Sequence, residues 1–167
     1  MHPLRLLLLA LTTILLGACA STPPIPNPQP GWAQATGQIQ SSGGAVPIVG
    51  EIAIRYDREN FLAEITKGPS LPLLRIYAKG PHAEHVTVRG ALARGSWSGA
   101  PANAPEALQA WVALPEVFHW AQAHSAGDRS YVIGLPDVKT GARRVGQAVT
   151  YLEYERRGEK IITRLQR

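Results

Sequence analysis

The chain has 167 residues, of which 17 are Lys or Arg and 12 are Asp or Glu, so its formal net charge is +5. This length suits one folded domain and is too short for two. The basic excess gathers near the C-terminus, interleaved with acids and hydrophobic residues, which favours a solvated sheet face over a nucleic-acid surface. A single cysteine excludes a disulfide within the chain, so packing must hold the fold.

Residues 1–18 have the pattern of an export signal. A basic start with Arg5 precedes an apolar run over residues 6–16, which only two threonines interrupt. The run is too short for a permanent membrane-spanning helix, which needs about 20 apolar residues. We therefore expect a signal peptide over residues 1–18 that is removed from the mature protein.

The signal ends in Leu16-Gly17-Ala18-Cys19, which resembles the lipobox of bacterial lipoproteins. The resemblance implies transfer of diacylglycerol to the Cys19 thiol, cleavage before this residue and acylation of its amino group with a palmitate-like chain. The alternative is an ordinary secretory signal with an incidental cysteine. A free thiol in an oxidising compartment argues against that alternative, and lipidation consumes the thiol.

Ala20 and Ser21 follow the lipobox cysteine, where retained lipoproteins have Asp. By resemblance to sorted lipoproteins, this implies a lipid anchor in the outer membrane of the cell envelope, with the domain facing the periplasm. Five prolines then lie between Ala20 and Gly31. Because proline lacks a backbone donor and fixes φ, we expect residues 19–31 to form an extended tether.

The folded domain is expected over residues 32–167, and its first half has the alternation of β-strands. Apolar residues occupy every second position of residues 46–56 and, after a polar turn, of residues 61–66. Shorter strands are expected over residues 73–79, 85–89 and 93–97. Their hairpin-length connections predict an antiparallel meander.

A helical segment is expected over residues 104–124. Asn103 can cap it, and Pro105 suits its first turn. Leu114-Pro115 should divide it into two short helices. Its large aromatic residues fall on one side: Trp111, Phe118 and Trp120. Strands resume over residues 130–135, and a final hairpin pairs 147–155 with 160–166 across a turn that contains Gly158.

This order predicts a mainly β (α+β) fold, a curled antiparallel sheet that forms a half-open barrel with a helical lid. Four motifs occur in a characteristic order: Ile65-Thr66-Lys67-Gly68-Pro69, Glu106-Ala107-Leu108, Leu114-Pro115 and Trp120. Over residues 32–167 the chain thereby resembles the LolA/LolB family of lipoprotein carriers and receptors, most closely the LolB-type outer-membrane lipoproteins. The resemblance implies a role in lipoprotein localisation.

From the predicted fold we expect an apolar concave cavity that binds acyl chains or another hydrophobic ligand. Its candidate lining is Ile52, Ile54, Phe61, Ile65, Ile76, Val88, Trp111, Phe118, Trp120, Leu152 and Tyr154. The alternative for each of these residues is a filled core. The alternative for the whole protein is a non-catalytic structural or scaffolding lipoprotein of an envelope complex.

The family's receptors use a protruding loop with an exposed apolar tip, and Leu71 is the candidate for that tip as a membrane or partner contact. An ordinary turn whose leucines enter the core is the alternative. Catalysis is not expected, because no serine lies in a nucleophile elbow and no glycine-rich phosphate loop is present. His82 and His85 have no cysteine or acidic cluster to complete a metal shell, so neither a metal nor another cofactor is expected.

Overall fold

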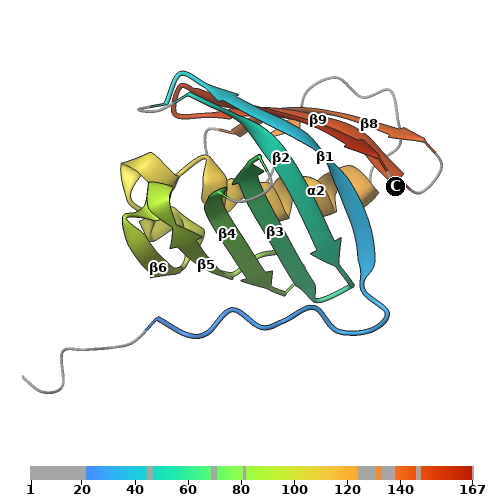
Figure 1. The fold of residues 1–167 in the computed structure, drawn as a ribbon. Coiled ribbons are helices and arrows are strands. Elements are labelled where there is room, and N and C mark those ends of the chain that lie inside the picture. Colours follow the sequence, from blue (N-terminus) through green and yellow to red (C-terminus); the bar gives the residue numbers. More distant parts are fainter. Residues whose placement is uncertain are drawn as a thin grey trace, which may run out of the picture.

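The computed structural model describes residues 22–44, 47–68, 71–80, 82–123, 131–132, 138–145 and 148–166. Within these ranges ten strands form one antiparallel sheet in the order β6-β5-β4-β3-β2-β1-β10-β9-β8-β7 (Figure 1). The strands are β1 (Ala33–Ser42), β2 (Ile48–Tyr56), β3 (Asn60–Lys67), β4 (Leu71–Lys79), β5 (His85–Gly90), β6 (Gly95–Gly99), β7 (Tyr131–Val132), β8 (Val138–Val145), β9 (Ala148–Arg156) and β10 (Glu159–Gln166).

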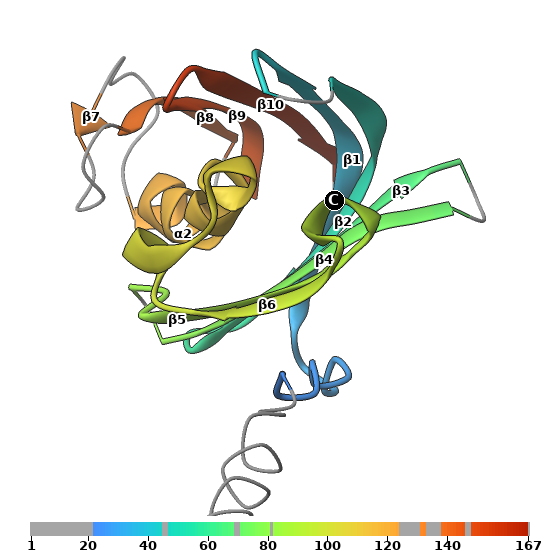
Figure 2. The same cartoon turned by 90° about the vertical axis from the view of Figure 1, so that its left-hand side faces the viewer.

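The sheet curls around a helical segment, and among the described residues β6 and β7 are its two edge strands, so these strands do not close into a barrel (Figure 2). The helical segment occupies the concave side over residues 101–123. It consists of the 3-10 turns η2 (Pro101–Asn103), η3 (Glu106–Leu108) and η4 (Trp111–Ala113), followed by the helix α2 (Leu114–Ala123). A further turn, η1 (Ala91–Ala93), joins β5 to β6. The predicted combination of a mainly β, curled antiparallel sheet with a helical cover is confirmed.

The inner face of the sheet is apolar because of the period-two patterns in the sequence. In β2 and β3 the buried residues of the inner face are Ile52, Ile54, Phe61, Ala63 and Ile65, which alternate with residues that point to the outer face. The helical segment adds buried Leu108, Val112 and Val117 to the same apolar cluster. The sheet and its helical cover therefore share one core.

Two strands were not predicted from the sequence. β1 lies between β2 and β10 at the centre of the sheet, although its sequence AQATGQIQSS contains one large apolar residue, Ile39. β8 pairs with β9 in the region between the expected strand at 130–135 and the final hairpin. The expected strand at 93–97 lies later, at Gly95–Gly99, because a 3-10 turn occupies residues 91–93.

The expected first helix is a series of 3-10 turns, and Asn103 does not cap it. Asn103 lies inside η2, and no side chain caps η3. Pro105 precedes η3 in an extended conformation with ψ 148°. In contrast, Pro115 lies in the first turn of α2 as expected, where its missing N–H costs no hydrogen bond.

The final hairpin is confirmed, with Glu159 paired to Arg156. Its two turn residues, Arg157 and Gly158, have φ of 50° and 81°. Two consecutive positive φ values match the right-handed twist of the flanking strands, and glycine adopts such a value without strain.

The N-terminal part, expected to form an extended tether, lies against the sheet. From Thr22 onward it runs along the outer, convex side of the sheet, beneath β3 to β6 (Figures 1 and 2). Ile25 in this segment is buried. The proline-rich sequence is extended as expected, but the sheet supports it.

Candidate functional site

The candidate cavity residues all lie between the concave face of the sheet and the helical segment. Ten of them are at most 2% exposed and belong to one apolar cluster: Ile52, Ile54, Phe61, Ile65, Ile76, Val88, Trp111, Phe118, Leu152 and Tyr154. Trp120 is half-buried and packs against the cluster. The sequence therefore identified residues that the fold brings together.

Aromatic rings fill the space between α2 and the first half of the sheet. The ring of Phe118 lies 4.9 Å from that of Tyr56 in an edge arrangement and 5.4 Å from that of Phe61, measured between centroids. These are contact distances for aromatic pairs. Around Phe118, the candidate site is a packed interior, and a ligand would have to displace this ring.

Two side chains of β9 attach the helical segment to the other half of the sheet. Tyr154 donates its hydroxyl hydrogen to the carbonyl oxygen of Ala110 at 2.8 Å, and Arg156 donates from Nη1 to that of Gln109 at 2.8 Å. Gln109 in turn donates from its side-chain amide to the carbonyl of Ala104. The carbonyl of Ala110 also accepts from the amide of Ala113 at 3.3 Å, so Tyr154 adds a second bond to this buried acceptor, while Arg156 supplies a donor to that of Gln109.

Glu159 lies beside the same region, at the start of β10. Burial raises the pKa of its carboxyl, while hydrogen bonds with the side chains of Trp111 and Ser41 act in the opposite direction. Burial also raises the pKa of Tyr154 far above its usual range, so this hydroxyl remains a donor. The helical segment is thus held by polar groups at its 3-10 end and by aromatic packing at α2.

Neither Gln109 nor Arg156 was identified from the sequence as part of this region. Arg156 lies two residues after Tyr154 and therefore on the same, inward face of β9. Because side chains alternate along a strand, the guanidinium group of Arg156 points into the domain. The alternation of β9 was the available signal, but the basic residues near the C-terminus were expected on a solvated sheet face.

His119 is a titratable group on α2 beside the aromatic cluster. Its ring centroid lies 6.0 Å from that of Phe61. Burial lowers its pKa, and a hydrogen bond with the side chain of Gln122 and the charge of Asp57 oppose this effect. The neutral imidazole is therefore the form that fits the packed interior.

The β3–β4 hairpin carries the predicted apolar tip. Leu71 is 54% exposed at the first position of β4 and pairs with Lys67. Val49 near the start of β2 is 70% exposed, and its strand runs beside β3 at the same end of the sheet. Figure 2 shows this hairpin extending beyond the neighbouring strands. Leu71 does not enter the core, so this end of the sheet presents two large apolar side chains to solvent.

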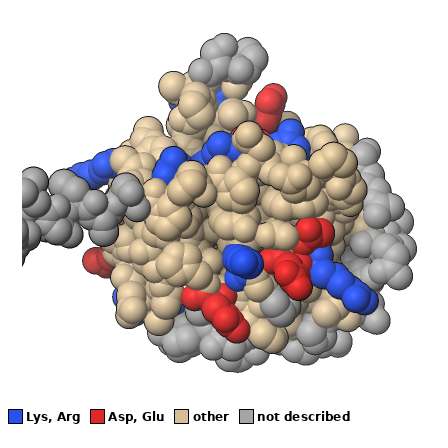
Figure 3. Space-filling view, turned by 90° about the horizontal axis from the view of Figure 1, so that it is seen from below, with Lys and Arg blue, Asp and Glu red and all other residues tan. Residues whose placement is uncertain are grey.

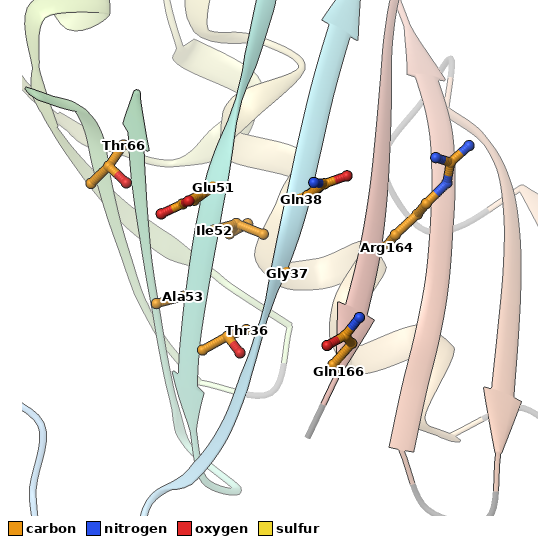
Figure 4. A pocket seen from close by; sticks show the side chains of 9 residues that line it. All are labelled: Thr36, Gly37, Gln38, Glu51, Ile52, Ala53, Thr66, Arg164 and Gln166. Carbon is orange, nitrogen blue, oxygen red and sulfur yellow. The ribbon is translucent and has the colours of Figure 1, made fainter. Parts of the chain in front are cut away.

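A hollow of about 550 Å³ lies on the outer side of the sheet, over β1, β2, β3 and β10. Its lining is mainly polar: Thr36, Gly37, Gln38, Glu51, Ile52, Ala53, Thr66, Arg164 and Gln166. Figure 4 shows that these side chains point in different directions. A Cβ at Gly37 would lie 1.9 Å from the carbonyl oxygen of Arg164, so only glycine permits this approach of β1 and β10. The hollow shares Ile52 alone with the candidate cavity.

Other predicted features fall partly outside the described ranges. Cys19 lies outside them, whereas His82 and His85 are exposed and His85 shares a hydrogen bond with Ser98. Among the described residues, no group of three or more His, Cys, Asp or Glu side chains is placed to hold a metal ion. Within the same ranges, no helix has the length and apolar character to cross a membrane.

A scan against protein-family models and a search of curated proteins gave no match to this chain.

Proposed function

We propose that this chain is an outer-membrane lipoprotein, anchored through Cys19, whose domain binds acyl chains or another hydrophobic ligand between its sheet and its helical segment. One observation carries the proposal. A single apolar core lies between an open, curled sheet and one helical cover, so movement of that cover would expose a continuous apolar groove.

The driving force would be the transfer of hydrocarbon from water into this groove, which contributes about 25 cal/mol per Å² of apolar surface buried. The ring of Phe118 fills the groove in the ligand-free domain. A bound chain would replace the contacts of that ring, and the bonds from Tyr154 and Arg156 would keep the 3-10 turns attached to β9. No catalytic step is involved.

The β3–β4 hairpin supports a role in lipoprotein localisation. The exposed side chain of Leu71 matches the apolar tip expected from the resemblance to LolB-type receptors. In this proposal the hairpin contacts a membrane or an incoming lipoprotein, and the acyl chains pass into the groove.

Anchoring is tested by replacing Cys19 with Ser and following radiolabelled palmitate. We expect the label to be lost and the protein to leave the outer-membrane fraction, because serine offers no thiol for lipid transfer. Persistent palmitate incorporation in the Cys19→Ser protein would contradict the proposed anchor.

Ligand binding is tested with a photoreactive fatty acid added to the lipidated protein. Crosslinks should map to peptides that contain Trp111 or Phe118, and excess palmitate should suppress them. Arg164 on the outer hollow provides the comparison, since its peptide should carry no competed crosslink.

The second candidate is a structural lipoprotein of an envelope complex. The close contacts of Phe118 with Tyr56 and Phe61 favour it, because a filled interior needs no ligand. Competed crosslinks inside the core would exclude this candidate, and their absence would support it.

A further inference from the structure

The N-terminal segment over residues 22–32, here called the strap, is bound to the outer face of the sheet by polar contacts. Arg89 on β5 donates from Nη2 to the carbonyl oxygens of Thr22 at 2.8 Å and Pro23 at 3.0 Å. The hydroxyls of Thr22 and Ser96, on β6, share a hydrogen bond of 2.8 Å. The first described residues are thus fixed at the β5–β6 corner.

Apolar burial holds the strap further along. Leu62 alternates with Phe61 and Ala63 and therefore faces outward, yet it is 0% exposed and lies outside the inner core cluster. Ile25 of the strap is 8% exposed and also lies outside that cluster. The strap lies over this outer side of the sheet in both ribbon views, where a buried, outward-facing leucine needs a cover.

The proline content explains why the strap docks without becoming a strand. Proline has no N–H to donate to a ladder, but its carbonyl can accept a hydrogen bond. A proline-rich segment can therefore be bound through its carbonyl oxygens, and Arg89 binds two successive ones. Because proline also restricts the unbound chain, docking costs less conformational entropy than it would for a flexible segment.

Docking leaves little free chain between the domain and the proposed anchor. Three residues, Cys19 to Ser21, precede Thr22, and three residues span at most about 11 Å in any conformation. The lipid surface must therefore lie close to the β5–β6 corner.

The chemistry of this corner suits an anionic lipid surface. Residues 85–99 include Arg89, Arg94 and His85 but no acidic residue, and the strap itself carries no charge. Figure 3 shows the side of the molecule on which the strap lies, and most of that surface is uncharged. Basic groups beside an anchored segment are attracted to anionic headgroups.

We propose that the strap holds the β5–β6 corner of the domain against an anionic phospholipid surface, so that the domain rests on the membrane instead of hanging from a free tether. This inference depends on the proposed lipid anchor at Cys19. The partner surface is the bilayer in which that anchor inserts.

The test uses the lipidated protein in phosphatidylethanolamine–phosphatidylglycerol vesicles that contain a headgroup spin label. A fluorophore is attached to Ala91→Cys at the corner or to Glu155→Cys in the other half of the sheet; both positions are exposed. Quenching at Ala91 should exceed that at Glu155 several-fold. Equal quenching at the two positions would overturn the inference.

The role of the strap is tested by combining Ile25→Ser with Arg89→Gln. This variant should lose most of the quenching at position 91, whereas Arg94→Gln, which removes the same charge but no strap contact, should retain most of it. Unchanged quenching in the strap variant would overturn the proposal.

A disulfide between Thr22→Cys and Ser96→Cys reports docking independently, and it should form rapidly because the two hydroxyls are in contact. If this disulfide does not form in the lipidated protein, the strap is not docked on the sheet. Absence of palmitate would instead reject the anchor and the membrane contact with it, while the disulfide would still report docking.

Discussion

The two faces of the sheet are covered in different ways. The inner face is covered by a helical segment through apolar packing, with Phe118 between two aromatic rings and Tyr154 bonded to a backbone carbonyl. The outer face is covered in part by a proline-rich strap, held by Arg89 and one isoleucine, and elsewhere by ion pairs. The helical segment contributes side chains to the core cluster, whereas Ile25 of the strap lies outside that cluster. The comparison predicts that substitutions on the inner side cost more stability.

The outer face also has a charge ladder across three strands. Glu64 on β3 pairs with Arg55 on β2 and with Arg75 on β4. All three side chains are about one-third exposed, and such pairs contribute about 1 kcal/mol or less. The ladder helps to fix register but leaves the inner core as the dominant source of stability.

The largest effect is expected from Phe118→Ala. Removing a buried ring that contacts Tyr56 and Phe61 should lower the free energy of unfolding by about 3–5 kcal/mol. The loss would be measured from the shift of the urea midpoint, with the slope of unfolding free energy against urea concentration unchanged. Val49→Ala, at a position 70% exposed, is the control and should change stability by less than about 0.5 kcal/mol. Similar losses for both variants would contradict the packed inner face.

A smaller effect is expected from Tyr154→Phe, which keeps the ring but leaves the carbonyl of Ala110 with only the longer bond from the Ala113 amide at 3.3 Å. Loss of one such hydrogen bond costs about 0.5–1.5 kcal/mol. Tyr77→Phe is the matched control on the outer face, where the lost bond to Asn60 is partly exposed and should cost less. If Tyr77→Phe and Tyr154→Phe lower the free energy of unfolding equally, the two faces do not differ in this respect.

The strap should contribute less than the helical cover. Ile25→Ala removes apolar surface at the margin of the outer face and should cost about 1–2 kcal/mol, estimated from about 0.8 kcal/mol per buried methylene. Hydrogen exchange at the amide of Ile25 should accelerate in this variant, while the amides of α2 remain protected. Acceleration in both places would mean that the strap and the helical cover unfold together.

The smallest effect concerns pH. Because burial lowers the pKa of His119 in the folded state, the unfolded chain binds its proton more readily. The free energy of unfolding is therefore highest when His119 is neutral in both states, above the unfolded pKa of about 6.5. It decreases as the pH falls below that value, because the unfolded chain then takes up the proton. The fall in unfolding free energy between pH 7 and 5 should diminish in His119→Gln. Exposed His82→Gln is the control, and an identical slope in His119→Gln and the parent would contradict the assignment.

The sequence predicted the inner face well because its strands alternate clearly and its helical segment contains large aromatic residues. Ile52, Phe61 and Phe118 could be placed together from periodicity alone. Alternation did not predict β1, because this strand consists mainly of small and polar residues and Ile39 is its one large apolar side chain. β1 is held by pairing with β2 and β10, and such long-range pairing leaves little trace in local sequence.

The strap shows a second limit of sequence analysis. Prolines predicted its extended backbone, but docking depends on contacts with Arg89 and Ser96, which lie far along the chain. Similarly, the sequence predicted the members of the candidate cavity but not the degree to which they fill it. The contact of Phe118 with Tyr56 depends on side-chain packing, which binary patterning does not specify.

The central claim is that the inner face accepts a hydrophobic ligand, and titration with a fluorescent fatty acid tests it most directly. The chain without its signal and Cys19 is titrated, and palmitate is added as a competitor. We predict saturable binding with one ligand per domain, displacement by palmitate and reduced protection of the α2 amides in the complex. A folded domain that shows no saturable uptake would contradict the claim and leave the structural lipoprotein as the better account.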